Sequence, residues 1–153
     1  MKILGIDPGT TQSAYVVWDS ETMDILEYGI KENLELSAML QFFQFDVCVI
    51  EMVASYGMAV GQTVFETCVW IGRFMNEIEN YSCNVVRITR NQVKNAICHS
   101  SKANDSNIRQ ALIDMYGGDK KIAIGTKKKP GRLYGIVKDE WAALAVAIAW
   151  HKT

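Results

Sequence analysis

The sequence lacks several features that mark membrane, secreted or disordered proteins. It has only two prolines and no low-complexity tract, which argues against disorder. No apolar run approaches the roughly 18 residues that a membrane span requires, since the richest stretch covers only residues 142–150. Asp7, Pro8 and Gly9 stand where a secretory signal needs an unbroken apolar core. We therefore expect no membrane association, and we expect a cytoplasmic location.

Closely spaced metal-binding cysteines are also absent. The four cysteines contain no C-x-x-C pair, and only Cys98 and His99 are neighbours among possible zinc ligands. A tetrahedral zinc site is normally built from such close pairs. Because each cysteine lies among apolar residues, we expect four reduced and mostly buried thiols.

The net charge is −1, but the charges are unevenly distributed. Up to Glu66 there are 10 acids and 2 bases, whereas from Thr67 onward there are 14 bases and 7 acids. Two segments, 80–104 and 120–138, contain no acid at all. Their basic residues are Arg87, Arg90, Lys94, Lys102, Lys120, Lys121, Lys127, Lys128, Lys129, Arg132 and Lys138. Charge alone fits either a phosphate-binding surface or a solvated lysine-rich loop.

Hydrophobic patterning predicts one α/β domain over residues 1–153, with a mixed sheet and helices on its faces. The predicted strands are 2–7, 13–19, 23–30, 45–52 and 84–88, with the first three forming an antiparallel meander. The predicted helices are 34–43, 60–78, 92–98, 107–116 and 139–150. The basic segment 119–135, which contains glycine and proline, is expected to be a mobile loop.

Three carboxylates stand at the ends of these predicted elements. Asp7 and Glu51 each end an apolar strand, and Asp139 opens the last helix. A carboxylate at the end of a central strand is costly to desolvate without a cation or hydrogen bonds. Each has an ordinary explanation, as a turn cap, a partner of a lysine and a helix N-cap respectively. Together they favour a divalent-cation site, and oxygen ligands suit Mg²⁺ or Mn²⁺ rather than zinc.

These acids belong to a longer ordered set of motifs. The set consists of Ile6-Asp7-Pro8-Gly9-Thr10, Val49-Ile50-Glu51-Met52-Val53, Asn91-Gln92-Val93-Lys94 and Asp139-x-x-Ala142-Ala143-Leu144-Ala145. In order and spacing it resembles the RuvC-type Holliday junction resolvases, and their bacteriophage branch most of all. The resemblance covers nearly the whole chain, although no single motif is specific.

The resemblance implies a ribonuclease H-like fold: a mixed five-stranded sheet with helices on both faces. It also implies a homodimer that cuts four-way or other branched DNA with Mg²⁺, for which Mn²⁺ substitutes. Asp7, Glu51 and Asp139 match the metal-binding acids, with Asp7 bridging two ions. Lys94 matches a lysine near the scissile phosphate, and Lys102 either matches a second one or has no counterpart. The residues expected to contact the DNA backbone are Arg87, Arg90, Lys94, Lys102, Lys127, Lys128, Lys129 and Arg132.

Two departures from the family pattern leave alternatives open. Ala142 stands where the family carries a second acid on the last helix, so Glu140 or Glu66 supplies a fourth ligand, or water does. Ala54 stands where cellular members carry an aromatic wedge, so Tyr56 or Met58 contacts the junction instead, or the junction is opened differently.

Two other functions also compete with this one. The missing acid favours a catalytically weakened junction-binding protein of the same fold. Residues 5–11 also resemble the first phosphate loop of sugar kinases and actin-like phosphotransferases. Such enzymes hold nucleotide between two domains, for which 153 residues are too few, so we expect no nucleotide cofactor.

Overall fold

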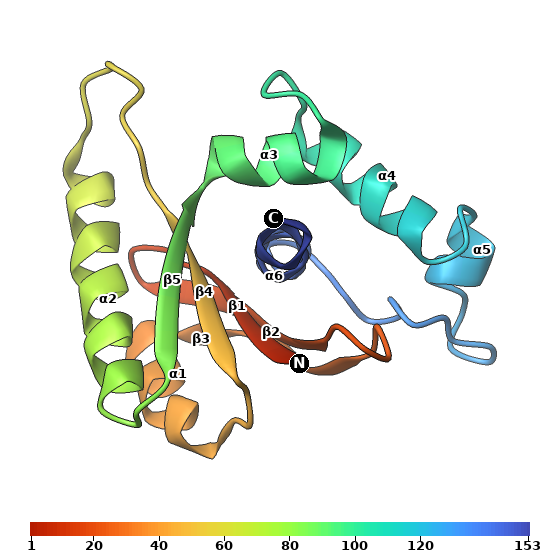
Figure 1. The fold of residues 1–153 in the computed structure, drawn as a ribbon, viewed down its shortest axis with the longest axis horizontal. Helices are drawn as coiled ribbons and strands as arrows, with labels where there is room; N and C mark the ends of the chain where they lie inside the picture. The colour runs from red at the N-terminus through yellow and green to blue at the C-terminus, as the bar shows by residue number, and fades with distance from the viewer.

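Five strands form one mixed sheet in the order β3-β2-β1-β4-β5 in the computed structural model, which describes residues 1–153 (Figure 1). The strands β1 (Lys2–Asp7), β2 (Gln12–Asp19) and β3 (Ile25–Glu32) form an antiparallel meander. The strands β4 (Val47–Met52) and β5 (Asn84–Thr89) run parallel to β1. This confirms the predicted five-stranded mixed sheet.

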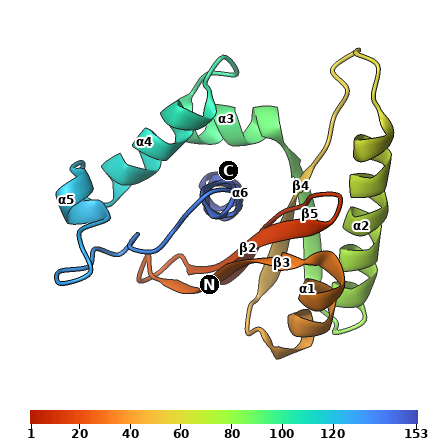
Figure 2. The ribbon, with the colours of Figure 1, turned by 180° about the vertical axis from the view of Figure 1, so that it is seen from behind.

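Helices cover both faces of the sheet, as predicted. On one face lie α1 (Asn33–Met39), the short 3-10 turn η1 (Leu40–Phe42) and α2 (Gln62–Glu79). On the other face lie α3 (Arg90–Cys98), α4 (Asp105–Met115) and α6 (Glu140–Lys152). Figures 1 and 2 show α6 end-on, lying between the sheet and the pair formed by α3 and α4.

Alternation along β1 sends its side chains into two separate cores. Ile3 packs into the core beneath α6, whereas Leu4 and Ile6 pack into the core beneath α2. Gly5 faces α6, and a Cβ at that position would overlap the carbonyl oxygen of Ala143. The absence of a side chain at Gly5 therefore lets α6 pack directly on the centre of the sheet.

Most predicted elements agree with the structure to within two residues at each end. The predicted helix 34–43 is instead α1 followed by the 3-10 turn η1. No helix is long and apolar enough to cross a membrane. All four cysteines are free, although only Cys48 is fully buried.

The basic segment 119–135 is more ordered than predicted. It contains α5 (Lys120–Ala123), and an isolated bridge pairs Gly125 with Pro130. The backbone amide of Leu133 donates to the carbonyl of Ala123, and both residues are fully buried. Two apolar anchors therefore fasten this segment to the core, a feature that its lysine-rich sequence concealed.

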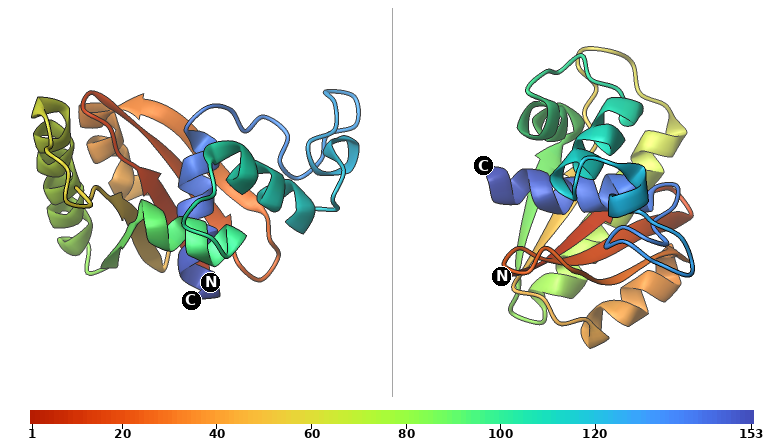
Figure 3. Two further views of the ribbon diagram at one scale, coloured as in Figure 1. Left: turned by 90° about the horizontal axis from the view of Figure 1, so that it is seen from above. Right: turned by 90° about the vertical axis from the view of Figure 1, so that its right-hand side faces the viewer.

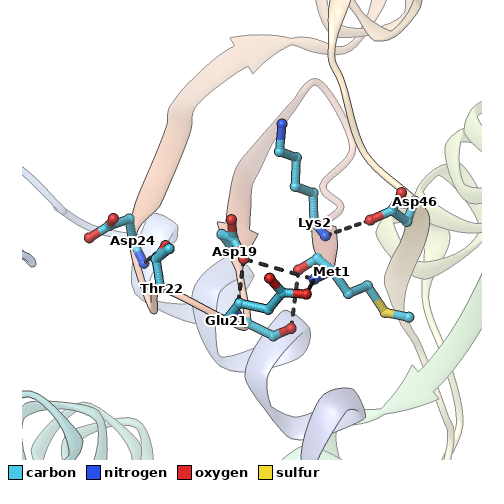
Figure 4. Close-up of polar contacts among 8 residues, drawn as sticks. Met1, Lys2, Asp19, Glu21, Thr22, Asp24 and Asp46 are labelled. Carbon is cyan, nitrogen blue, oxygen red and sulfur yellow. Dashed lines mark hydrogen bonds and ion pairs between the residues drawn. The ribbon is translucent and has the colours of Figure 1, made fainter.

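The amino-terminal end of β1 carries an acidic cluster of its own, formed by Asp19, Glu21, Asp24 and Asp46 (Figure 4). The amino terminus lies 3.8 Å from Asp19 and 3.4 Å from Glu21, and the Lys2 amide donates to Asp46 at 2.7 Å. These acids fix the chain end and the following turn. Part of the negative charge of the first 66 residues is thus structural.

Candidate active site

Asp7 and Glu51 lie at the same edge of the sheet. Each is at or near the carboxyl end of its strand, and the parallel register pairs Ile6 with Ile50. Side chains alternate between the faces of a strand. Because Ile3 and Val49 pack beneath α6, Asp7 and Glu51 point to that same face. The two carboxylates therefore sit side by side at the end of the core under α6.

Asp139 joins them from the start of α6. This helix packs across the sheet in Figure 3, and the close approach at Gly5 fixes its position over β1. Although Asp139 occupies the N-cap position, its side chain makes no capping hydrogen bond. The ordinary explanation of Asp139 as a helix cap is therefore wrong, and its carboxylate is available to other groups.

A buried polar network holds the turn that follows Asp7. The Gly9 amide donates to Ser13 Oγ at 3.1 Å, and this hydroxyl donates to Asn33 Oδ1 at 2.6 Å. Asn33 Nδ2 closes the ring by donating to the Gly9 carbonyl at 2.9 Å. The side chain of Asp7 takes no part, so it does not cap its own turn. Sequence reasoning missed Ser13 and Asn33, because nothing in the local pattern shows that residues 20 positions apart share one turn.

Neighbouring charges and burial raise the proton affinity of Asp7 and Glu51. Burial, followed by the charges of Glu51 and Asp139, raises the pKa of Asp7 from 3.8 to about 7, against a lowering by Arg90. Burial also raises the pKa of Glu51, although Arg90 and Lys94 oppose this and Asp139 adds to it. A desolvated cluster of like charges is typical of a functional site rather than of a structural surface.

Two cations from α3 face this cluster. Thr89 and Gln92 form a capping box, with the Gln92 amide donating to Thr89 Oγ1 at 3.3 Å and the Thr89 amide donating to Gln92 Oε1 at 2.7 Å. The box starts α3 directly beside the end of β4, where the register pairs Met52 with Thr89. Arg90 then donates to Glu51 at 3.3 Å, and Lys94 follows one turn later.

The chemistry of the donor set fits a divalent cation. All three groups are carboxylates, and a dication would relieve the repulsion that raises the pKa of Asp7. In the present side-chain positions no three acidic, histidine or cysteine residues converge on a single ion. Glu51 is instead drawn toward Arg90. Metal binding by Asp7, Glu51 and Asp139 therefore stays a prediction.

Each of the two candidates for a fourth ligand already accepts a hydrogen bond from another group. Glu140 is buried and accepts a hydrogen bond from the Val137 amide at 2.8 Å, which fixes the turn before α6. Glu66 is exposed on α2 and accepts from Gln62 at 2.8 Å. Neither contributes to the raised pKa of Asp7 or Glu51. Ligation by either one stays a prediction.

Tyr56 lies in the loop between β4 and α2 and contacts the start of α3. Its hydroxyl accepts from the Asn91 amide at 3.2 Å, although the side chain is 56% exposed. Met58, in the same loop, is 74% exposed. Figures 1 and 2 show this loop rising at the same end of the molecule as the connection between α3 and α4. Contact of Tyr56 with DNA stays a prediction.

The remaining basic residues occupy three different places. The alternation of side chains along β5 places Arg87 on the face of the sheet that α2 covers, away from the acids. Lys102 lies in the exposed connection between α3 and α4. Lys127, Lys128 and Lys129 are exposed in the turn beside the Gly125–Pro130 bridge. Arg132 donates to the Thr22 carbonyl at 3.1 Å and lies 3.7 Å from Asp24. Arg132 therefore fastens its segment to the turn between β2 and β3, a contact that charge patterning did not predict.

No protein-family model matches the chain, and no curated protein is similar to it in sequence. Solved structures do match its fold. Thermus thermophilus RuvC aligns with a TM-score of 0.72 at 16% identity, over 99% of this chain and 94% of RuvC. The same RuvC in complex with a Holliday junction substrate gives a TM-score of 0.72 at 16% identity, covering 99% and 93%. The yeast mitochondrial Holliday junction resolvase Ydc2 gives 0.65 at 14% identity, covering 98% and 77%. The chain therefore has the RuvC fold.

Proposed function

We propose that this chain, as one domain of the RuvC fold, is a metal-dependent endonuclease that cuts four-way or other branched DNA. One observation carries the proposal: three carboxylates come together from three elements of that fold, the partly desolvated Asp7 and Glu51 and the exposed Asp139. The match to RuvC bound to a Holliday junction supports the choice of branched DNA. The four free cysteines favour action in the cytoplasm, where thiols stay reduced.

Asp7, Glu51 and Asp139 are proposed to hold Mg²⁺, with Mn²⁺ as a substitute. When bound, such ions activate water for attack on a phosphodiester and offset the charge that develops on it. Burial partly desolvates Asp7 and Glu51, and the network of Ser13 and Asn33 holds the turn that follows Asp7.

Lys94 is proposed to stabilise negative charge on the reacting phosphate. It stands one helical turn after Arg90 on α3, and its charge acts on Glu51. Losing one such preorganised donor typically slows catalysis by about 10²–10³-fold. Lys127, Lys128 and Lys129 are proposed to contact backbone phosphates farther away, which gives affinity without sequence preference.

A homodimer would supply two such sites for a symmetric junction. Helical spacing predicts an apolar stripe for pairing at Val64, Cys68, Ile71 and Met75, but Ile71 is buried against the chain's own sheet. The exposed apolar side chains of α2 are instead Phe65 and Val69, which are 55% and 56% exposed. They are four residues apart and so share one face of the helix. We propose this face as the dimer contact.

The experiment is a cleavage assay on a synthetic four-way junction, with a linear duplex of the same sequence as comparison. We expect nicking of the junction only with Mg²⁺ or Mn²⁺. Glu51→Gln should abolish cleavage but retain junction binding, and Glu79→Gln, at the exposed end of α2, is the matched control. Near-normal cleavage by Glu51→Gln would contradict the role of Glu51.

The second candidate function is junction binding with weakened catalysis. It is favoured by Ala142, which lines a small pocket with Asp139 and Arg90 where the family pattern has another acid. The same assay separates the two functions. Junction binding by the wild-type chain, with no nicking at any concentration of Mg²⁺ or Mn²⁺, would establish the second.

A further inference from the structure

Arg90 bridges two carboxylates that come from different elements. One guanidinium nitrogen donates to Glu51 Oε2 at 3.3 Å, and the other binds Asp105 at the start of α4. The Arg90 side chain is 25% exposed, whereas Glu51 is 17% and Asp105 is 85% exposed. Arg90 thus contacts a half-buried acid of the cluster on one side and a solvated acid on the other.

The surroundings of Arg90 bring its charge onto the acid cluster. A pocket of about 70 Å³ is lined by Arg90, Asp105, Asp139 and Ala142, among others. Arg90 also lowers the pKa of Asp7 and that of Glu51, so its charge reaches both carboxylates. A cationic side chain of the protein therefore already contacts Glu51, one of the acids proposed to hold the divalent ion.

We propose that Arg90 couples cation binding to DNA binding, because its guanidinium competes with the divalent ion for Glu51 until a DNA phosphate draws it away. This inference rests on the proposed function. A guanidinium forms two parallel hydrogen bonds with a phosphate, as it does with a carboxylate. The other partner of Arg90 is the solvated Asp105, and solvent-exposed ion pairs hold a side chain only weakly.

The transfer of Arg90 from Glu51 to a DNA phosphate affects the binding of both the cation and the DNA. When a phosphate takes Arg90, Glu51 is released to the cation, so DNA strengthens cation binding. The coupling is reciprocal, and the cation must strengthen DNA binding by the same factor. Couplings between sites typically amount to ~5–150-fold, and we expect about tenfold here.

The test measures Mn²⁺ affinity by electron paramagnetic resonance of free Mn²⁺, using the full chain with and without a four-way junction. Each reading is taken before cleavage, as gel electrophoresis of the same samples verifies. The variants are Arg90→Gln, Asp7→Asn and, as matched control, Lys152→Gln. Lys152 is exposed at the carboxyl end of α6, the opposite end of this helix from Asp139.

For the wild-type chain and Lys152→Gln, the junction should tighten Mn²⁺ binding about tenfold. Without DNA, Arg90→Gln should bind Mn²⁺ about tenfold more tightly than the wild-type chain does. Adding the junction should then raise the Mn²⁺ affinity of Arg90→Gln by less than about twofold. Equal or weaker Mn²⁺ binding by Arg90→Gln, while Asp7→Asn loses it, would overturn this inference and leave the proposed function standing. Unchanged Mn²⁺ binding by Asp7→Asn would overturn the proposed function itself.

Arg90→Lys is the alternative variant if Arg90→Gln does not fold, since lysine retains the positive charge at the start of α3. An ammonium group lacks the planar fork that binds two oxygens of one phosphate. The junction should therefore tighten Mn²⁺ binding less in Arg90→Lys than in the wild-type chain. Wild-type coupling in Arg90→Lys would contradict the proposed exchange.

Discussion

Asp7→Asn should stabilise the protein at neutral and alkaline pH when a chelator removes divalent cations. The pKa of Asp7 rises from 3.8 in the unfolded chain to about 7 in the folded one. Below pH 3.8 the carboxyl is neutral in both states, and the substitution changes little. As the pH rises toward 7, Asp7 loses its proton in the unfolded chain but keeps it in the folded chain. The wild type therefore loses stability over this pH range.

The size of this loss follows from the shift. About three units at ~1.36 kcal/mol each give about 4 kcal/mol above pH 7, and residual solvent contact lowers this to roughly 2–4 kcal/mol. Asparagine is nearly isosteric, and the Asp7 side chain makes no hydrogen bond that asparagine would lose. The raised pKa thus corresponds to a loss in the free energy of unfolding, which arises because the ionised Asp7 is desolvated in the folded chain.

Urea unfolding at pH 4 and pH 8 with chelator measures the difference in free energy of unfolding. Asp114→Asn, on α4, is the matched control and should show no such pH dependence. Mn²⁺ should then stabilise the wild-type chain but not Asp7→Asn, because we expect only the former to bind it. If Asp7→Asn is no more stable than wild type at pH 8, the carboxylate is solvated and the reasoning is wrong.

Three further predictions concern the surroundings of the acids. Gly5→Ala should displace α6 from Ala143, lower the stability by about 1–3 kcal/mol and slow cleavage, whereas Gly72→Ala, with open space around it, should not destabilise. Asn33→Ala should cost roughly 1–3 kcal/mol in urea unfolding, because it leaves buried partners without hydrogen bonds; an unchanged midpoint would show that the network is not needed. Replacing Lys127–Lys129 with alanine should lower the slope of log affinity against log salt by about 1 for each phosphate that the chain no longer neutralises, and an unchanged slope would place the DNA elsewhere.

The strands could be predicted because they depend on short-range patterns, and the proximity of the acids could be predicted from the fold class. Alternation and turn residues define the strands, and parallel strands place their carboxyl ends at one edge. Asp7 and Glu51 end adjacent strands, so their proximity follows from the order of the sheet. The sequence alone does not decide whether those carboxylates cap or pair locally, and the structure leaves Asp7 and Asp139 without such partners.

The contacts that tune the site could not be predicted, because they join residues far apart in the chain. Arg90 and Asp105 meet only because α3 and α4 pack together, whereas from the sequence we expect Arg90 among the residues that contact the DNA backbone. The buried ring of Asn33, Ser13 and Gly9 likewise depends on the meeting of separate elements. Charge patterning locates a basic segment but does not identify which of its residues already has a partner.

The most direct test of the central claim is the anomalous scattering of Mn²⁺ soaked into crystals of the wild-type chain. We expect at least one peak ~2.0–2.2 Å from a carboxylate oxygen of Asp7, shared with Glu51 or Asp139. A fully soaked crystal with no peak at Asp7, or with manganese bound only by the acids around the amino terminus, would contradict it.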